Sequence, residues 1–301
     1  MSARSFSRLL LASSLLLSAA AASSAKTIQL VVPSFDYPDD GYNNTQALGI
    51  ANNGTIVGTI SENQHGTVVS FERFADGSFS QPFGYPRASV TIASGVNSSN
   101  LVCGFLFTDA NHGFFYNGQA FTLYDVPEAT GTFVGGVNDA GDFCGYSTSG
   151  PIGTGEVFLP FVNIGGTYQC FTIPGMTDAT AKAINNLGQV TGTYVDPTDA
   201  SSHGYLREAD GTLIYPLDLP AASELFITGL NDKGLIVGSA PHSSRLNGFV
   251  FKMPGQFVSY NFADAVYGVD FSGINNSEVI PGYFISAADG LGHSFIAQIV
   301  K

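Results

Sequence analysis

The sequence predicts an all-β fold, a six-bladed β-propeller whose blades are four-stranded and antiparallel. The first observation is a ten-residue phrase that recurs six times, with starts near residues 49, 95, 136, 183, 229 and 273. The starts lie 46, 41, 47, 46 and 44 residues apart, which is too short for separate domains and suits a blade of four short strands. The second observation is that the two ends of the chain complement each other, as a closed ring requires.

The phrase, called the decamer below, predicts the turn between the first and second strands of each blade. Its copies read GIANNGTIVG, GVNSSNLVCG, GVNDAGDFCG, AINNLGQVTG, GLNDKGLIVG and GINNSEVIPG. Asn and Gly in its middle supply the positive-φ positions of a tight turn. We expect the third strand to begin with a signature such as His112-Gly113-Phe114, which reads Glu156-Val157-Phe158 in the third copy. A fourth strand such as Phe121 to Pro127 follows, and proline suits its outer edge.

The chain ends predict how the ring closes. The last copy stops after its third strand, residues 293–300, so it lacks a fourth. Residues 27–33 (TIQLVVP) precede the first decamer and resemble the fourth strand at residues 168–174. We therefore expect the N-terminal strand to complete the last blade and to leave no open sheet edge.

The first 25 residues predict a secretory signal peptide. Arg4 and Arg8 precede an apolar and small run at residues 9–22, and Ser23-Ser24-Ala25 follows. A run of about 14 residues cannot span a hydrocarbon core of about 30 Å, so a transmembrane helix is disfavoured. We expect cleavage after Ala25 and an exported single domain, residues 26–301, that is secreted or periplasmic, monomeric and not inserted in a membrane.

The charge of the chain argues against a nucleic-acid partner. The net charge is -13, and loss of the signal peptide removes two of the 11 basic residues and none of the 24 acidic ones, leaving -15. Phosphate binding needs a basic footprint that such a chain lacks. Cys103, Cys144 and Cys170 are expected to be small buried residues, because their places in the repeat do not bring two of them into disulfide reach.

The decamer followed by His-small-aromatic resembles the HAF repeat family of bacterial extracellular proteins. The resemblance covers residues 46–301 and implies secretion and a repeat fold, with no assigned activity. His65, His112, His203 and His293 occupy the family's histidine position. Third strands lie about 10 Å from the axis, too far for these side chains to share one zinc ion at about 2.1 Å. We expect each histidine to hold the start of its strand by bonding to nearby backbone.

Candidate binding residues follow from sorting the loops by face. Loops from strand 2 to 3 and from strand 4 to the next blade emerge on one face, the long-loop face; the other two turns of each blade emerge on the turn face. The long-loop face is expected to be strongly acidic, with these candidate ligand-binding residues: Asp36, Asp39, Asp40, Asp109, Asp196 and Asp199. Variable loops on a rigid scaffold are where binding usually resides, although acidic loops also serve solubility alone.

The function expected from this face is binding of a carbohydrate or another extracellular or envelope component, with calcium as the cofactor that such oxygen ligands suit. One alternative is a metal-dependent propeller hydrolase or lactonase, in which loop carboxylates hold a metal that activates water. No nucleophile elbow or HExxH motif accompanies it. A second alternative is a protein-interaction scaffold with an exposed apolar patch. Lys182 and Asp270 are the charged residues expected along the channel, where they would bind an axial ligand or meet water.

Overall fold

The computed structural model describes residues 26–63, 66–150, 156–219, 224–242, 245–252, 256–260 and 265–300. The predicted signal peptide and His65 lie outside them. The regular elements of these residues are β-strands, and none of this part of the chain forms a helix long and apolar enough to cross a membrane. The strands are β1 (Thr27–Phe35), β2 (Tyr42–Ile50), β3 (Ile56–Glu62), β4 (Val68–Arg73), β5 (Val90–Val96), β6 (Val102–Phe107), β7 (Asn111–Tyr116), β8 (Phe121–Tyr124), β9 (Gly131–Val137), β10 (Phe143–Ser149), β11 (Val157–Ile164), β12 (Thr167–Cys170), β13 (Thr177–Ile184), β14 (Val190–Val195), β15 (Ser202–Arg207), β16 (Leu213–Leu217), β17 (Phe226–Leu230), β18 (Leu235–His242), β19 (Arg245–Lys252), β20 (Gln256–Tyr260), β21 (Ala265–Phe271), β22 (Val279–Ser286) and β23 (Gly292–Val300).

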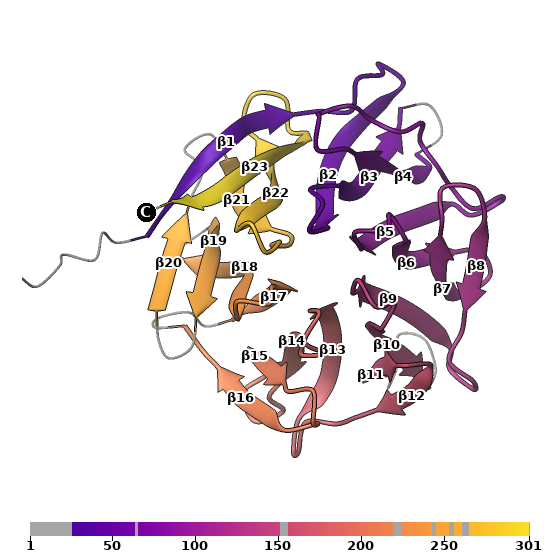
Figure 1. Ribbon diagram of the computed structural model, residues 1–301, viewed down its shortest axis with the longest axis vertical. Coiled ribbons are helices and arrows are strands. Elements are labelled where there is room, and N and C mark those ends of the chain that lie inside the picture. The colour runs from indigo at the N-terminus through magenta and orange to yellow at the C-terminus, as the bar shows by residue number, and fades with distance from the viewer. Residues whose placement is uncertain are drawn as a thin grey trace, which may run out of the picture.

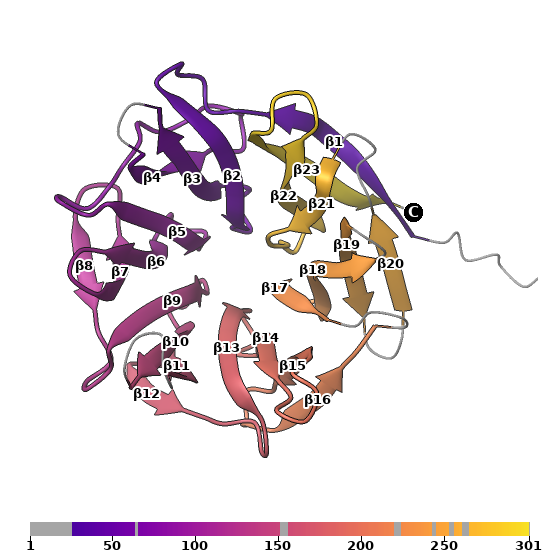
Figure 2. The same ribbon diagram turned by 180° about the vertical axis from the view of Figure 1, so that it is seen from behind.

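Consecutive strands form antiparallel groups that stand around a central axis (Figures 1 and 2). The groups are β2–β4, β5–β8, β9–β12, β13–β16, β17–β20 and β21–β23. The first strand of each group lies nearest the axis (Figure 1). Single parallel bridges such as Val68↔Val90 and Asn111↔Gly131 join the third strand of one group to the first strand of the next.

β1 pairs with the strand at the other end of the chain. Its antiparallel ladder with β23 runs from Thr27↔Val300 to Phe35↔Ser294. Ile28 and Leu30 pack against the core of the β21–β23 group. The predicted strand at residues 27–33 is therefore present and extends to Phe35.

The β21–β23 group contacts the β2–β4 group as consecutive groups contact each other. Ser294 on β23 donates its hydroxyl to the carbonyl of Thr45 (3.0 Å) and accepts the N–H of Ala47 (2.8 Å). Ser70 on β4 makes the same two bonds to Thr91 and Ala93 of the next group (both 2.9 Å). The contact between the last and first groups thus repeats a contact made between neighbours in sequence.

The last glycine of the decamer is required by a close approach of two strands. A Cβ added at this position would lie within 2.3 Å of a carbonyl oxygen on the first strand of the same group. This holds for all six copies: Gly58, Gly104, Gly145, Gly192, Gly238 and Gly282. The ladder slips by one residue beside this glycine in copy after copy, for example between Ala93 and Gly95. Such a bulge leaves no room for a side chain there.

Each of these glycines faces a buried aromatic ring on the third strand. The pairs include Gly104↔Phe114 and Gly192↔Tyr205, and both rings are fully buried. This register corrects the predicted third strands of two copies. In the third copy Phe161, not Phe158, faces Gly145. In the first copy the ring is Phe71, so the histidine position is occupied by Val69 rather than His65. The sequence match failed because the loops before these strands differ in length.

Asparagine at decamer position three links neighbouring groups. Asn138 accepts the N–H groups of Ala140 (3.0 Å) and Asp142 (2.9 Å), and its Nδ2 donates to the carbonyl of Asn185 in the next group (3.1 Å). The equivalent donors are Asn97, Asn185, Asn231 and Asn275, at 3.0 to 3.3 Å from the next group's carbonyl. The first copy has Ala51 at this position. The recurring asparagine therefore both shapes its own turn and joins two groups.

Replacing Asn138 with Ala should lower the free energy of unfolding by about 3 kcal/mol, because it removes two hydrogen bonds within its own turn and one to the carbonyl of Asn185 in the next group. Chemical denaturation of the variant measures this loss. The matched control is Asn117→Ala, since Asn117 accepts the N–H groups of Gln119 and Ala120 in an exposed turn but joins no second group. We expect that change to cost about 1 kcal/mol. Equal losses for the two variants would contradict the linking role of Asn138.

Two expectations about outer strands are wrong. Residues 79–83 of the first copy form only isolated bridges, Ser70↔Phe83 and Arg73↔Phe79, in place of a regular fourth strand. Cys103 and Cys144 are buried as expected, but Cys170 is exposed. Cys170 ends β12, whose four residues are all exposed, so its place on an outermost strand explains the difference.

Candidate functional site

The turn-face end of the axis is filled by side chains from decamer position four. The backbone N–H of Ser98, Asp139, Asn186, Asp232 and Asn276 each donates to the side chain of the next group, at 2.8 to 2.9 Å. The Nδ2 of Asn186 donates to both Asp139 (3.0 Å) and Asp232 (3.2 Å). The carboxylates of Asp139 and Asp232 thus accept hydrogen bonds from other residues of the same polar ring. The space that remains between these side chains is only about 60 Å³.

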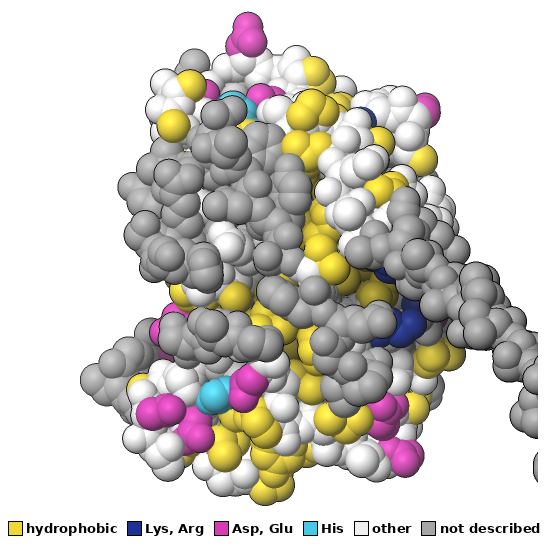
Figure 3. All heavy atoms as spheres, turned by 90° about the vertical axis from the view of Figure 1, so that its left-hand side faces the viewer, with side chains coloured by type: hydrophobic (Ala, Val, Ile, Leu, Met, Phe, Trp, Pro, Cys, Tyr) yellow, Lys and Arg dark blue, Asp and Glu magenta, His cyan; other side chains and the backbone are white. Residues whose placement is uncertain are grey.

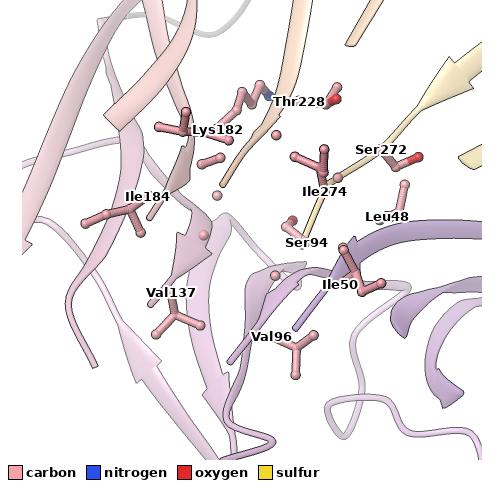
Figure 4. A pocket seen from close by; sticks show the side chains of 18 residues that line it. Leu48, Ile50, Ser94, Val96, Val137, Lys182, Ile184, Thr228, Ser272 and Ile274 are labelled. Carbon is pink, nitrogen blue, oxygen red and sulfur yellow. The ribbon is translucent and has the colours of Figure 1, made fainter. Parts of the chain in front are cut away.

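A constriction follows along the axis, at decamer positions one and two (Figure 4). Its space is about 70 Å³, and its walls include Ile50, Val96, Val137, Ile184 and Ile274. Glycines at position one allow the first strands to approach each other here; a Cβ at Gly95 would lie 3.0 Å from the Cα of Gly136. The constriction and the polar ring leave the long-loop face as the open approach to the axis.

Beyond the constriction, on the long-loop side, lies a cavity of about 320 Å³, called the axial cavity below. Its walls come from the first strands and, in four of the groups, from the residue that follows the last decamer glycine on the second strand. The lining includes Gln46, Leu48, Thr59, Ile92, Ser94, Phe105, Phe133, Tyr146, Lys182, Asp270, Ser272 and Tyr283. The volume lies in the range of small-molecule sites, which begins near 300 Å³.

One wall of the axial cavity is aromatic. Phe133 on β9 stacks on Tyr146 of β10, with ring centroids 4.6 Å apart and planes inclined by 6°. Phe105 on β6 contacts Phe133 edge-on at 4.9 Å. Burial raises the pKa of Tyr146 to about 12, so its hydroxyl is neutral at ordinary pH. This wall offers an apolar, π-rich surface to a ligand.

β21 and the residue after it carry polar groups of the cavity that lack partners. Asp270 accepts a hydrogen bond at Oδ2 from the Tyr283 hydroxyl (3.2 Å). Its Oδ1 and the hydroxyl of Ser272 are buried and have no hydrogen-bond partner among the described residues. Burial raises the pKa of Asp270 to about 6, opposed by the hydroxyl groups of Ser239 and Tyr283 and by Lys182. Unpartnered buried groups are costly, so a water molecule or a ligand in the cavity is needed to complete them.

Lys182 lies in the same cavity without a close counter-ion. Its Nζ lies 5.0 Å from the centroid of the Tyr146 ring, a cation–π contact. Burial lowers the pKa of Lys182, although Asp270 favours the charged form. No carboxylate of the described residues comes within 4.0 Å of its Nζ. Lys182 and Asp270 were expected to line the channel, and both line the axial cavity. Their binding of an axial ligand stays a prediction.

Asp270→Asn is expected to change the pH dependence of stability. Because the pKa of Asp270 is raised in the folded state, the folded state binds its proton more tightly than the unfolded state does. The free energy of unfolding should therefore fall as the pH rises from about 4 to about 6, by up to about 3 kcal/mol from this group. The variant should lack this fall and be more stable than the wild type at pH 7. Urea denaturation at pH 4, 5, 6 and 7 measures the difference.

The control for this change is Asp40→Asn, which removes an exposed carboxyl group. Its pH profile is the reference for the loss of an exposed carboxyl group. If Asp270→Asn changed the pH profile no more than Asp40→Asn did, the carboxyl group of Asp270 would not titrate abnormally.

The six carboxylates predicted on the long-loop face are spread over several groups. Asp39 caps its own turn by accepting the N–H of Gly41 (2.9 Å), and the backbone carbonyl of Asp40 accepts the side chain of Asn63 (2.7 Å). Asp36 and Asp109 lie beside His293 and His112. Only Asp196 and Asp199 come together, within the described residues, in a group that could hold a metal. Acidic side chains border a histidine at the lower left of Figure 3.

The histidines bind carboxylates, so the expectation that they bind backbone is wrong. The Nδ1 atoms of His112, His203 and His293 lie 3.0, 2.6 and 2.9 Å from Asp125, Asp218 and Asp36. Each partner carboxylate follows a fourth strand, where the sequence offered no reason to place an acid beside the histidine. Burial alone would lower the pKa of His112 and His293, but the neighbouring carboxylates raise it overall. The stabilisation from these two pairs is therefore lost as the pH rises through the raised pKa.

The His203 cluster carries one more carboxylate than the others. Ligand atoms of Asp196, Asp199 and His203 lie within 4.8 Å of one another. The Ser201 hydroxyl lies 2.7 Å from Nε2 of His203 and 2.6 Å from Asp199. Asp218 at Nδ1 fixes the ring, as a carboxylate does for many metal-bound histidines. This cluster is on the rim and not in the axial cavity.

Sequence reasoning missed the aromatic wall and Tyr283. The residues directly after the last decamer glycine are Thr59, Phe105, Tyr146, Thr193, Ser239 and Tyr283. Because side chains alternate along a strand, a residue next to a core-facing position points away from that core. Sorting the copies at this position would have found these side chains. The exposed large apolar residues of the described part are spread over several strand groups, as Val31, Phe107 and Leu187 illustrate.

Comparisons with known proteins bear on the fold alone. No protein-family model and no curated protein sequence matches the chain. Among solved structures, a TolB-type protein from Agrobacterium tumefaciens is similar with a TM-score of 0.52 and 11% identity, covering 86% of this chain and 91% of its own. The subtype N11 neuraminidase-like protein of the influenza virus A/flat-faced bat/Peru/033/2010 (H18N11) gives 0.51 and 10%, covering 92% and 94%. The all-β fold of this chain is that of a β-propeller.

Proposed function

We propose that this protein is an exported β-propeller that binds a carbohydrate or another extracellular or envelope component in its axial cavity. The observation that carries the proposal is the cavity of about 320 Å³ with an aromatic wall on one side and the unpartnered polar atoms of Asp270, on β21, and Ser272, directly after it. Sugars present apolar C–H faces and hydroxyl groups, which suit these two kinds of surface. The long-loop face remains the binding face, with its site at the axis.

The proposal includes a closed six-bladed ring. Two observations support closure: the ladder between β1 and β23, and the contact of Ser294 with Thr45 and Ala47. A closed ring holds the cavity walls, which come from separate groups, in a fixed arrangement. Export by the signal peptide and membership of the HAF-type repeat family are part of the same proposal and rest on the sequence.

The test is a thermal-shift and calorimetric screen of residues 26–301 against neutral and acidic sugars. A ligand at 100 times its Kd adds about 2.7 kcal/mol, which should raise the Tm by about 5 °C or more. Ser94→Phe should fill the cavity and abolish the shift, whereas Thr122→Phe on the exposed face of β8 should not. Binding that persists in a folded Ser94→Phe variant would place the site elsewhere, and no binding of any sugar would reject carbohydrate recognition.

A second candidate function is metal-assisted hydrolysis at the rim. The grouping of Asp196, Asp199 and His203, with Asp218 behind the histidine, favours it. Calcium or zinc should then raise the Tm, EDTA should reverse the rise, and His203→Ala should remove the response to zinc. His112→Ala is the matched control, because its ring has Asp125 in the place of Asp218 but has one further carboxylate, Asp109, where His203 has two. No shift with either metal would reject both the calcium site and the hydrolase.

A further inference from the structure

The charge arrangement in the axial cavity narrows the class of ligand, given the proposed function on which this inference rests. The ammonium group of Lys182 lies over the ring of Tyr146, and this is its one contact with an aromatic ring among the described residues. Its hydrogen-bond donors have no acceptor among the described residues. An enclosed ammonium group is stabilised by an acceptor of negative charge. A ligand that offers only hydroxyl groups would leave Asp270, which forms no ion pair with Lys182, as the carboxylate that favours this charge.

Asp270 sets a limit on the ligand's negative charge. Its Oδ1 lacks a donor, and it shares the cavity with Lys182. A ligand with several anionic groups would be repelled by this carboxylate, whereas a hydroxyl group would donate to it. One carboxylate and at least one hydroxyl group therefore match Lys182 and Asp270 together.

The remaining lining distinguishes a sugar from an amino acid. Polar side chains line the part of the wall that three neighbouring groups form, on Gln46, Thr59, Ser94 and Ser272, and the aromatic pair of Phe133 and Tyr146 covers another part of it. An apolar amino acid has its polar groups at one end. A pyranose has hydroxyl groups around its rim and an apolar face, which fits a wall of this composition.

We infer that the ligand of the axial cavity is a sugar acid, a pyranose ring with one carboxylate, whose carboxylate pairs with Lys182, whose hydroxyl groups bond to Asp270 and Ser272, and whose apolar face lies on Phe133 and Tyr146. The binding is noncovalent, and no bond in the sugar is made or broken. The aromatic wall recognises the apolar face of the sugar, and Lys182 recognises its carboxylate.

Calorimetric titration with matched pairs of sugars tests this inference. D-glucuronate and D-glucose share a ring and differ in the carboxylate, as do D-galacturonate and D-galactose. We expect at least one uronate to bind tenfold more tightly than its neutral counterpart. Lys182→Gln should remove that preference, while Lys252→Gln, which removes an exposed charge from the end of β19, should keep it. A melting curve of each variant confirms that it is folded.

The other outcomes separate the two proposals. Equal binding of uronate and neutral sugar would overturn the sugar-acid inference and leave carbohydrate binding standing. A preference for the uronate that survives in folded Lys182→Gln would overturn the inference as well, because the carboxylate would then be read elsewhere. Acetate binding as tightly as the uronate would show that only the anion matters. No binding of any of these sugars would overturn both proposals.

Discussion

Gly192→Ala is expected to destabilise the fold by at least about 4 kcal/mol, or to prevent folding. The added Cβ would lie 1.8 Å from the carbonyl oxygen of Thr180 and 3.1 Å from the Cα of Ala181. Both are backbone atoms of β13, which cannot move away without breaking its ladder with β14. Overpacking against backbone belongs to the few mechanisms that give losses of this size. Urea denaturation, or the yield of soluble protein, measures the effect.

A second glycine of the decamer provides the control. A Cβ at Gly273 would meet its nearest atoms at 3.6 Å, an ordinary van der Waals distance. The fourth copy already has Ala183 at the same decamer position. Gly273→Ala should therefore change the free energy of unfolding by less than about 1 kcal/mol. Similar losses at Gly192 and Gly273 would mean that the bulge beside Gly192 tolerates a side chain.

A chain that begins at Asp36, without β1, is expected to lose about 5 kcal/mol of stability and to self-associate. Removal of β1 takes away the partly buried side chains of Ile28, Leu30 and Val32 and the whole ladder with β23. Burial of each such aliphatic side chain contributes about 1.5 kcal/mol or more. The exposed edge of β23 would then offer a template for pairing with another chain.

Light scattering after gel filtration, with thermal denaturation, measures both effects. A synthetic peptide of residues 26–36 added to the truncated chain should restore the monomer and raise the Tm. An open array of repeats would lose little stability and would not respond to the peptide. That result would contradict closure of the ring through β1.

The periodicity of the decamer was enough to predict the strands and the pairing of the two chain ends. A turn sequence with Asn and Gly fixes a hairpin locally, and the missing fourth strand of the last copy left β1 one natural partner. The third strands of the first and third copies were predicted in the wrong place. Their register depends on the contact of Phe71 and Phe161 with the decamer glycines of the neighbouring strand. Because the preceding loops differ in length, the sequence does not show which residue makes that contact.

The candidate site was predicted only in part. Lys182 and Asp270 stood out as charges on first strands, and they line the axial cavity together. The six predicted carboxylates lie in the expected loops, but most of them do not lie close together. Loop residues converge only where the strand ends are near each other. Asp196 and Asp199 do so with His203, while Asp39 and Asp40 serve their own turn. The aromatic wall depends on which second-strand residue follows a bulge, which a single copy does not reveal.

The most direct measurement of ligand binding in the axial cavity is a methyl NMR titration of residues 26–301 with the uronates and their neutral counterparts. The methyl groups of Leu48 and Ile92 line the cavity, while Leu187 and Leu123 are exposed away from it. Binding in the cavity predicts saturable shifts of Leu48 and Ile92 at one common Kd, with Leu187 and Leu123 unchanged. Shifts confined to residues outside the cavity, or no saturable shift with any of these sugars, would contradict the proposal.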